Sequence, residues 1–316
     1  MILSPAEPNL GTVPTAATAR PTRQSWGELL HPGALVQIAI LALLLGLAYR
    51  VQLSDRIVYR WIRDPNWSHG WLVPLFSIYF LSTQRHALMR VQLRTNVLGL
   101  LLLLASMVVY FGSLLLLQMS YPQALSIVLA IMGVTLFLGG WDLFRIAWFP
   151  IAFLALAIPL PDWTYIEMTM PLRVLASDAA AGLLSLIPDL DAQRSGVTID
   201  YIFRGKHGQP LNVEEACSGM RLMMAFMTLG LAMAYLGDRP VWQRVIMVLA
   251  CIPIAVICNI IRVTITGCIH VFHIRALASG TPHALLGLAM LPIALGLFAL
   301  IGYVLKNLFV EVPEEA

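Results

Sequence analysis

Long apolar runs separated by short polar segments make up most of the sequence from residue 33 onward. A helix that crosses a bilayer needs about 20 predominantly apolar residues. Eight runs approach or reach that length, at residues 33–51, 69–82, 96–117, 124–140, 145–160, 219–236, 242–262 and 283–305. The second and fifth are short and contain Pro74 and Pro150. The pattern predicts an all-α polytopic membrane protein with about eight transmembrane helices, with seven and nine as the alternatives.

Residues 161–218 form the one sizeable segment that this pattern places outside the membrane. Its first part has an apolar stripe at helical spacing, made of Leu172, Leu175, Ala179, Leu183 and Leu186. Arg173, Ser177 and Ser185 lie on the opposite side of such a helix. This arrangement is typical of a helix that lies in the membrane interface, and we expect one over residues 172–187.

The same segment continues with a pattern of period two. Val197, Ile199, Tyr201 and Phe203 alternate with mostly polar residues, which predicts an extended strand. Two glycines within residues 204–208 indicate a turn, and a second extended stretch follows over 209–213. We therefore expect a short β-hairpin immediately before the sixth span.

The domain organisation is simple. Residues 1–32 contain five prolines and no apolar signal-peptide core, and they predict a flexible N-terminal tail. Residues 33–305 form the membrane domain, and residues 306–316 form a short acidic tail. With a cytoplasmic N-terminus, the inner loops and ends carry nine basic residues and the short outer loops carry five, which favours this orientation.

Composition removes several classes of protein. The apolar residues make up 59% and the charged residues 12%, with a mean hydropathy of +0.79, which excludes a disordered chain, a coiled coil and a disulfide scaffold. The net charge of +3 comes from scattered residues, so no basic surface for nucleic acid is expected. The four cysteines form no C-x-x-C pair and no metal-ligand spacing with histidine. No metal or organic cofactor is expected.

Three chemically capable residues fall at one predicted membrane depth. Cys217 is at the outer start of the sixth span, Arg262 is near the outer end of the seventh, and His283 is at the outer start of the eighth. Because they come from three separate helices, their common depth is the main indication of a site.

Each residue has physical grounds for a role. A helix N-terminus favours a thiolate at Cys217, and Arg221 one turn later adds positive charge. An arginine near the bilayer is costly unless it faces a polar interior, so Arg262 should point into the bundle, with Asn259 three residues earlier to orient it. At a helix start, His283 is favoured as a neutral imidazole that can accept a proton.

Ordinary structural explanations stay open for each residue taken alone. A cysteine at a helix start is more often structural than reactive, and an arginine at the end of a span is commonly an interfacial anchor. His270 and His273 lie close to His283 in the sequence and are its rivals. Cys251 and Cys258 are expected to be packing residues.

The motifs together resemble the exosortase/archaeosortase family. The resemblance covers about residues 34–305 and rests on the string Val213-Glu214-Glu215-Ala216-Cys217-Ser218-Gly219-Met220-Arg221, the pair Asn259-x-x-Arg262, the histidine that opens the last span, and the run Asn66-Trp67-Ser68-His69-Gly70-Trp71. Archaeosortases typically have arginine at the third position, so His283 places the chain on the exosortase side.

The resemblance implies a cysteine protease or transpeptidase in the cytoplasmic membrane of a bacterium, with its active site at the outer face. Such enzymes cut C-terminal sorting signals, in which a short Pro-Glu-Pro-like motif precedes a transmembrane helix and a basic end, and they pass the protein to an acceptor. By residue match the nucleophile is Cys217, with Arg262 and His283 as its partners. Asn259, Arg221 and Glu215 are expected to support them.

Two other classes of function remain open from the residues. In a transporter or a lipid-handling or polysaccharide-handling protein, Arg262 would bind an anion and Cys217 would be incidental. In a non-catalytic scaffold, all three residues could be replaced without loss. No convincing inverted repeat supports the transporter.

Overall fold

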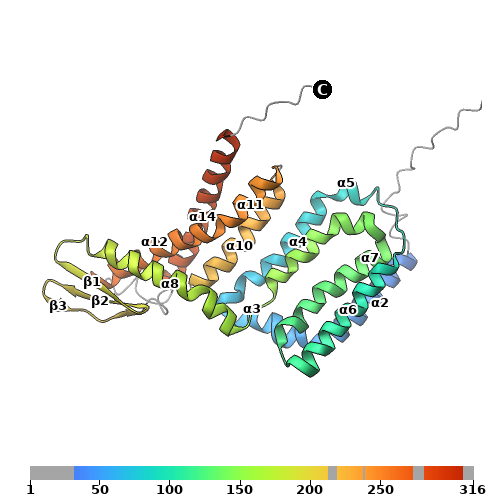
Figure 1. Ribbon diagram of the computed structural model, residues 1–316, viewed down its shortest axis with the longest axis horizontal. Helices are drawn as coiled ribbons and strands as arrows, with labels where there is room; N and C mark the ends of the chain where they lie inside the picture. The colour runs from blue at the N-terminus through green and yellow to red at the C-terminus, as the bar shows by residue number, and fades with distance from the viewer. Residues whose placement is uncertain (1–31, 213–218, 238, 273–280, 309–316) are drawn as a thin grey trace, which may run out of the picture.

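The computed structural model describes residues 32–212, 219–237, 239–272 and 281–308, and it is mostly helical with one small sheet (Figure 1). Within the described residues, four helical segments are long and apolar enough to cross a membrane: Val97–Leu117, Ser120–Ala157, Val241–Val271 and Leu286–Asn307. The polytopic helical class is therefore confirmed. The count of eight spans stays a prediction.

The elements before the first long segment are short. They are α2 (Pro32–Ala48), the π-helix η1 (Gln52–Val58), α3 (Tyr59–Arg63), the 3-10 helix η2 (Pro65–Trp71), α4 (Leu72–Thr83) and α5 (Arg85–Leu88). Asp64 caps η2, because its carboxylate accepts a hydrogen bond from the N–H of Asn66 at 2.9 Å. The cap fixes the chain reversal between α3 and η2, which places η2 against the elements that carry the candidate site.

Helix α6 (Val97–Gly112) continues into the π-helix η3 (Ser113–Leu117) and packs closely on α7 (Ser120–Phe153). Glycines make this approach possible. A Cβ at Gly99 would overlap the backbone of Phe137, and a Cβ at Gly133 would lie 2.8 Å from the N atom of Leu103. Glycine commonly allows such backbone contact between membrane helices.

Helix α7 changes direction at Gly140, where φ is 66° and ψ is −167°. This conformation is open essentially to glycine alone. It falls at the boundary between the expected spans 124–140 and 145–160, so the long helical segment consists of two helices joined at a kink. After the second part, η4 (Leu154–Ala157) leads to α8 (Asp162–Leu184).

Helix α8 differs from the expected interfacial helix in its start and in the face that it buries. It begins ten residues before residue 172, and its buried face contains Arg173, Ala176, Ser177 and Ala180. Leu175, Leu183 and Leu186 of the leucine stripe are exposed instead. The small residues Ala176, Ser177 and Ala180 determine which face is buried, because they let α8 approach α12 (Cys251–Val271) closely. Gly267 on α12 receives Leu184 of α8 in the same contact.

The sheet follows α8 and contains four short strands. Strand β1 (Leu190–Ser195), which the sequence pattern did not predict, pairs antiparallel with β2 (Thr198–Phe203) from Leu190↔Phe203 to Ser195↔Thr198. Strands β3 (Lys206–His207) and β4 (Leu211–Asn212) both pair with β2. Arg204 and Gly205 form the β2–β3 turn with φ values of 51° and 73°, within the expected turn segment.

The remaining helices are α10 (Gly219–Leu236), α11 (Val241–Leu249), α12 and α14 (Thr281–Leu308). They share an apolar core that contains Phe226, Met247, Ile254, Met290 and Phe298. Helix α12 continues nine residues past the expected span 242–262. That extension packs with α8 on the sheet, where Ile199 and Val263 are buried together.

Candidate functional site

The structure describes some of the predicted site residues and not others. Cys217, Glu215 and His273 lie outside the described residues, as do the N-terminal tail and most of the acidic C-terminal tail. Arg221 and His283 fall in the first turns of α10 and α14, where the backbone is described. Asn259, Arg262 and His270 all lie on α12. The site can therefore be built from α12 outward.

Arg262 is the centre of the described part of the site. It is 3% exposed, and its carbonyl oxygen accepts a hydrogen bond from the Thr266 hydroxyl at 2.9 Å. Its guanidinium reaches α14, because a Cβ at Gly287 would lie 3.6 Å from Cζ and from Nη2 of Arg262. Gly287 comes one helical turn after His283, so α12 presents the arginine to the same part of α14 in which His283 lies.

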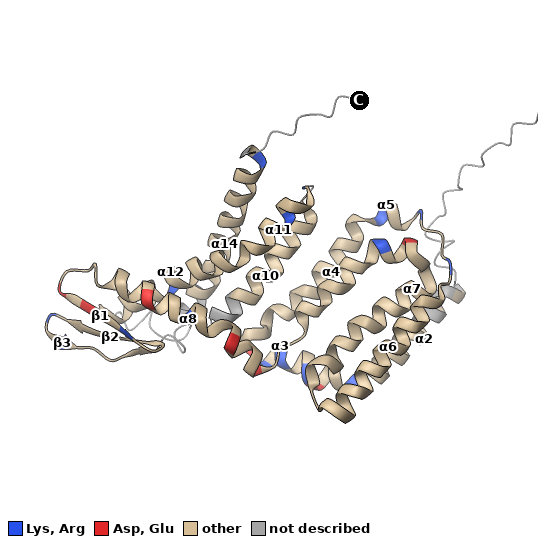
Figure 2. Ribbon diagram, in the orientation of Figure 1, with Lys and Arg blue, Asp and Glu red and all other residues tan. Residues whose placement is uncertain are grey.

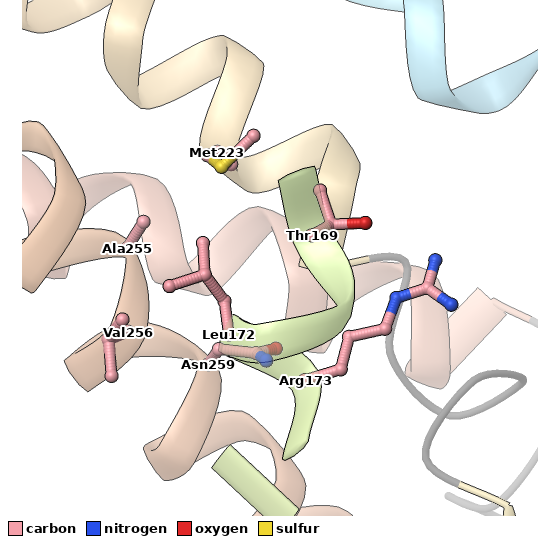
Figure 3. A pocket seen from close by; sticks show the side chains of 7 residues that line it. All are labelled: Thr169, Leu172, Arg173, Met223, Ala255, Val256 and Asn259. Carbon is pink, nitrogen blue, oxygen red and sulfur yellow. The ribbon is translucent and has the colours of Figure 1, made fainter. Parts of the chain in front are cut away.

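Asn259 lies one turn before Arg262 and is 6% exposed. Its Oδ1 is buried and has no hydrogen-bond partner among the described residues. It borders a small cavity of about 20 Å³ (Figure 3). A cavity of that volume has room for about one water molecule. The cavity is lined by Thr169, Leu172, Arg173, Met223, Ala255, Val256 and Asn259.

Arg173 is the residue that sequence reasoning missed. It is 4% exposed and borders the same cavity from α8, although the pattern placed it on the polar side of an interfacial helix. Thr169 and Ser177 lie one turn before and one turn after it and are also buried. The spacing of these three polar residues at i, i+4 and i+8, next to Ala176 and Ala180, is the sequence signal that could have revealed a buried polar face.

The two helices that hold these polar residues run parallel. Thr169 and Ala255 border one end of the cavity, Arg173 and Asn259 border it further along, and Leu184 contacts Gly267 beyond them. Because Arg262 follows Asn259 by three residues, it lies about one turn beyond Arg173 along the shared direction. The pairing of α8 with α12 thus places two buried arginines in one interface.

The acidic residues of α8 face away from that interface. Asp162 accepts hydrogen bonds from Arg60 at 2.8 and 3.2 Å, and Asp178 accepts one from Arg194 at 3.0 Å. Glu167 is exposed. The guanidinium of Arg60 lowers the pKa of Asp162 below its usual value. The carboxylates of α8 therefore lie on its outer side, whereas its one arginine, Arg173, is buried in the interface.

The run Asn66–Trp71 forms η2 and packs beside the starts of α8 and α10. Trp67 is buried with Tyr165 of α8 and Met224 of α10, and the Trp67 and Tyr165 rings are 5.8 Å apart. His69 is also buried, with its ring 5.6 Å from that of Trp67. This cluster fixes the first turns of α8 and α10 relative to each other.

The rival residues on α12 have different environments. His270 is exposed near the end of the helix, two turns beyond Arg262. Cys251 and Cys258 are buried in the apolar core, as expected for packing residues. Within the part of the chain that the structure describes, no group of three or more histidine, cysteine or acidic residues could hold a metal ion.

This geometry defines a class of protein. It is a helical membrane protein in which an asparagine and two arginines are buried where four helices meet. The chain matches the family of the transmembrane exosortase (Exosortase_EpsH) over residues 61–300. It therefore belongs to the exosortase family, whose members are generally sorting enzymes that transfer peptides. The comparisons with curated proteins and with solved structures gave no match.

Proposed function

We propose that this protein is a cysteine transpeptidase that cleaves C-terminal sorting signals of exported proteins, with Cys217 as nucleophile and Arg262 and His283 as its partners. The observation that carries the proposal is the contact of Arg262 with α14 at Gly287, one turn after His283. It brings together two helices, α12 and α14, that nine residues separate in the sequence. The third helix, α10, begins two residues after Cys217.

In this mechanism the Cys217 thiolate attacks the carbonyl carbon of the scissile peptide bond and forms a tetrahedral intermediate. Arg262 donates hydrogen bonds to the negatively charged oxygen of that intermediate. His283 takes the thiol proton and gives it to the leaving amine, so that the C–N bond breaks and a thioester remains. The amine of an acceptor, or water, then attacks the thioester and restores the thiol.

A buried arginine suits this role better than an exposed one. Its charge is not screened by water, so its hydrogen bonds to a developing oxyanion are stronger than they would be at the surface. Its position also costs no reorganisation during the reaction, because the carbonyl of Arg262 is tied to Thr266 and its guanidinium packs against Gly287.

We also propose that the site faces the outside of the cytoplasmic membrane. Lysine and arginine lie at the end of the molecule formed by α5, α11 and the end of α14, and others lie around α3 at the opposite end (Figure 2). By the sequence count above, the predicted inner side has nine basic residues and the short outer loops have five. Lys306 is in the last turn of α14, whereas His283 is in its first turn. Basic residues favour the cytoplasmic side, so this charge distribution supports an outward-facing site.

The sheet next to the site is the proposed contact for an extended substrate segment. Strand β1 has a neighbour on one side only within the described sheet. On its other edge the Ser185 hydroxyl bonds to the N–H and the C=O of Ala192, so a peptide would pair with the part of the edge beyond Ala192. Deletion of the segment 190–212 would then abolish processing of a reporter protein. Unchanged processing after a deletion that preserves membrane insertion would contradict this contact.

The central experiment is thiol labelling of the membrane-embedded protein with iodoacetamide between pH 5 and 9, read at Cys217 by peptide mass spectrometry. We expect Cys217 to label faster than Cys268, with an apparent pKa below the ~8.5 of a free thiol. Arg262→Ala and His283→Ala should raise that pKa, while His270→Ala, a histidine exposed on α12, should not.

Two results would contradict the assignment. Labelling of Cys217 no faster than that of Cys268, or labelling unaffected by both substitutions, would remove Cys217 as nucleophile. A Cys217→Ser protein that processes a sorting-signal reporter at the full rate would do the same. In either case an anion-binding transporter with Arg262 in its binding site would become the better explanation.

A further inference from the structure

A cationic cluster where α10, α11 and α14 meet has no part in the proposed mechanism. It consists of Arg239 in the connection between α10 and α11, Arg244 on α11, and Lys306 in the last turn of α14. Figure 2 shows basic residues on α11 and at the end of α14. The proposed catalytic His283 lies in the first turn of α14. The cluster is therefore separate from the candidate site, and its charge requires an explanation of its own.

Two glycines hold the guanidinium of Arg239 in place. Its Nη1 donates a hydrogen bond to the carbonyl oxygen of Gly302 on α14 at 2.9 Å. A Cβ at Gly302 would lie 2.8 Å from Nη2 of Arg239, and a Cβ at Gly237 would lie 3.1 Å from its Nε. The side chain therefore packs between the end of α10 and the end of α14, with backbone on both sides of it.

Arg244 and Lys306 complete the cluster around this guanidinium. The Nε of Arg244 donates a hydrogen bond to the carbonyl oxygen of Arg239 at 2.8 Å. Lys306 follows Gly302 by four residues, so it lies one turn further along the same face of α14. Both arginine bonds end at neutral carbonyl groups, and each uses one of the five N–H groups of a guanidinium. These bonds order the two side chains and leave their charge uncompensated.

The chain around the cluster has few carboxylates. Residues 239–308 contain no aspartate and no glutamate. Asp238 and the glutamates of the C-terminal tail lie outside the described residues. The ion pairs that the structure shows within the described residues both involve α8. Three cations held close together repel one another, and an anionic group bound between them removes that repulsion.

The surface beside the cluster is suited to lipid. Trp242 of α11 and Tyr303 of α14 are 41% and 69% exposed, and both residue types are enriched at the level of lipid headgroups. Further from the cluster along the two helices, Val245, Leu249 and Leu300 are exposed apolar residues. A molecule that joins an anionic head to apolar chains is complementary to both parts of this surface. A dissolved anion matches only the cluster.

We propose that the cationic cluster binds the phosphate of an anionic phospholipid in the membrane leaflet at this end of the molecule. Basic pockets between transmembrane helices bind acidic lipid headgroups. The phosphate oxygens accept hydrogen bonds from Arg239 and Arg244 and attract Lys306. The bound lipid thereby joins the α10–α11 connection to the end of α14. This inference goes beyond the proposed function and does not rest on the chemistry at Cys217.

The test measures lipid binding to the full chain by native mass spectrometry from detergent. Phosphatidylglycerol and phosphatidylcholine with identical acyl chains are titrated separately, and the dissociation constants of the first bound lipid are compared. We expect the wild type to bind phosphatidylglycerol at least about tenfold more tightly, because each basic residue near the headgroup contributes about fivefold in affinity. Arg244→Gln and Lys306→Gln should each lower that preference by about fivefold. Arg145→Gln, which removes an exposed arginine of α7, is the matched control and should retain it.

A second measurement uses the wild-type protein alone and so does not depend on the folding of a variant. Inorganic phosphate is added as a competitor of bound phosphatidylglycerol. We expect no displacement at equal concentrations, because the dissolved ion lacks the acyl chains that contribute to lipid binding. Arg239 is left unchanged in both measurements, since its bond to Gly302 also supports the packing of α14.

Equal binding of the two lipids by the wild type would overturn the proposal, because that result is expected if the acidic residues of the chain itself neutralise the cluster. A wild-type preference in a protein with both Arg244→Gln and Lys306→Gln would also overturn it. Displacement by inorganic phosphate at equal concentration would replace the lipid by a dissolved anion. None of these measurements depends on the labelling of Cys217, so the lipid site and the proposed function fail in different experiments.

Discussion

The pair α6–α7 and the pair α8–α12 both bring helix backbones close together with small residues, but they bury different chemistry. Gly99 and Gly133 let α6 meet α7 through apolar surfaces, and most of α6 remains exposed. Ala176, Ser177 and Ala180 let α8 meet α12 around Arg173 and Arg262. Close packing is thus common to both regions. Buried charge is confined to the second, and that difference separates a structural interface from a candidate site.

The largest expected effect comes from the charge at the centre of the second region. Replacing Arg262 by Gln should slow thioester formation by about two to three orders of magnitude, the loss typical of one oxyanion donor. Single-turnover formation of the thioester with a sorting-signal reporter measures it. Arg145→Gln, which removes an exposed arginine of α7, should change the rate little. A rate of thioester formation for Arg262→Gln within a few-fold of the wild-type rate would contradict the assignment of the α8–α12 interface as the candidate site.

The next-largest effect is expected from a substitution in the α6–α7 pair. Gly99→Leu would force a side chain into the backbone of Phe137 and should destabilise the α6–α7 pair by about 1–3 kcal/mol. Thermal unfolding in detergent measures it. Gly112→Leu in the same helix is the matched control, since nothing lies within 4 Å of a Cβ there. If both variants lose stability equally, glycine packing is not what holds the pair together.

The aromatic contact between α7 and α10 should contribute less to the free energy of unfolding. Phe149 of α7 stacks on Tyr235 of α10 with ring centroids 4.0 Å apart and an interplanar angle of 5°. A double-mutant cycle with Phe149→Leu and Tyr235→Leu should show a coupling free energy of about 1 kcal/mol. Additive losses in the free energy of unfolding would mean that the stacked rings act independently.

The smallest effect concerns the ion pair at the start of α8. Arg60 and Asp162 have side-chain exposures of 35% and 69%, so their coupling should be about 0.5 kcal/mol. Because the pKa of Asp162 is lower in the folded protein, the contribution is complete above the ordinary aspartate pKa of about 3.9 and is lost as the pH falls through the lowered value. Unfolding of the wild type and Asp162→Asn between pH 3 and 7 measures it. A difference that grows toward acidic pH would refute this sign.

The sequence pattern predicts the class and several boundaries well, because burial in a membrane requires long apolar runs. The family resemblance and the break near residue 140 were also predictable. The sequence analysis did not identify which face of α8 is buried. A leucine stripe has the same period whether it faces lipid or protein. The burial of the face with Ala176 and Ala180 depends on α12, a partner helix distant in the sequence. Strand β1 was missed because the segment Leu190–Ser195 is largely polar.

The candidate site shows the same division. Asn259 and Arg262 could be selected because charged and amide side chains stand out within an apolar run. Arg173 was missed, because it lies in a segment of mixed polarity where an arginine is ordinary, and only its helical spacing with Thr169 and Ser177 pointed to it. Its burial is a tertiary property, created when α8 pairs with α12. The roles of Cys217, Arg221, Glu215 and His283 stay predictions.

The contact between Arg262 and Gly287 also has a consequence for the order of events during synthesis. Helix α14 begins at Thr281, so the packed surroundings of Arg262 are completed only after α14 has been made. At about 5–20 residues per second, the ribosome adds α14 within a few seconds of α12. Until then the arginine has to lie in another environment. If Arg262 acts as proposed, a nascent chain cannot react with exported proteins before α14 has inserted.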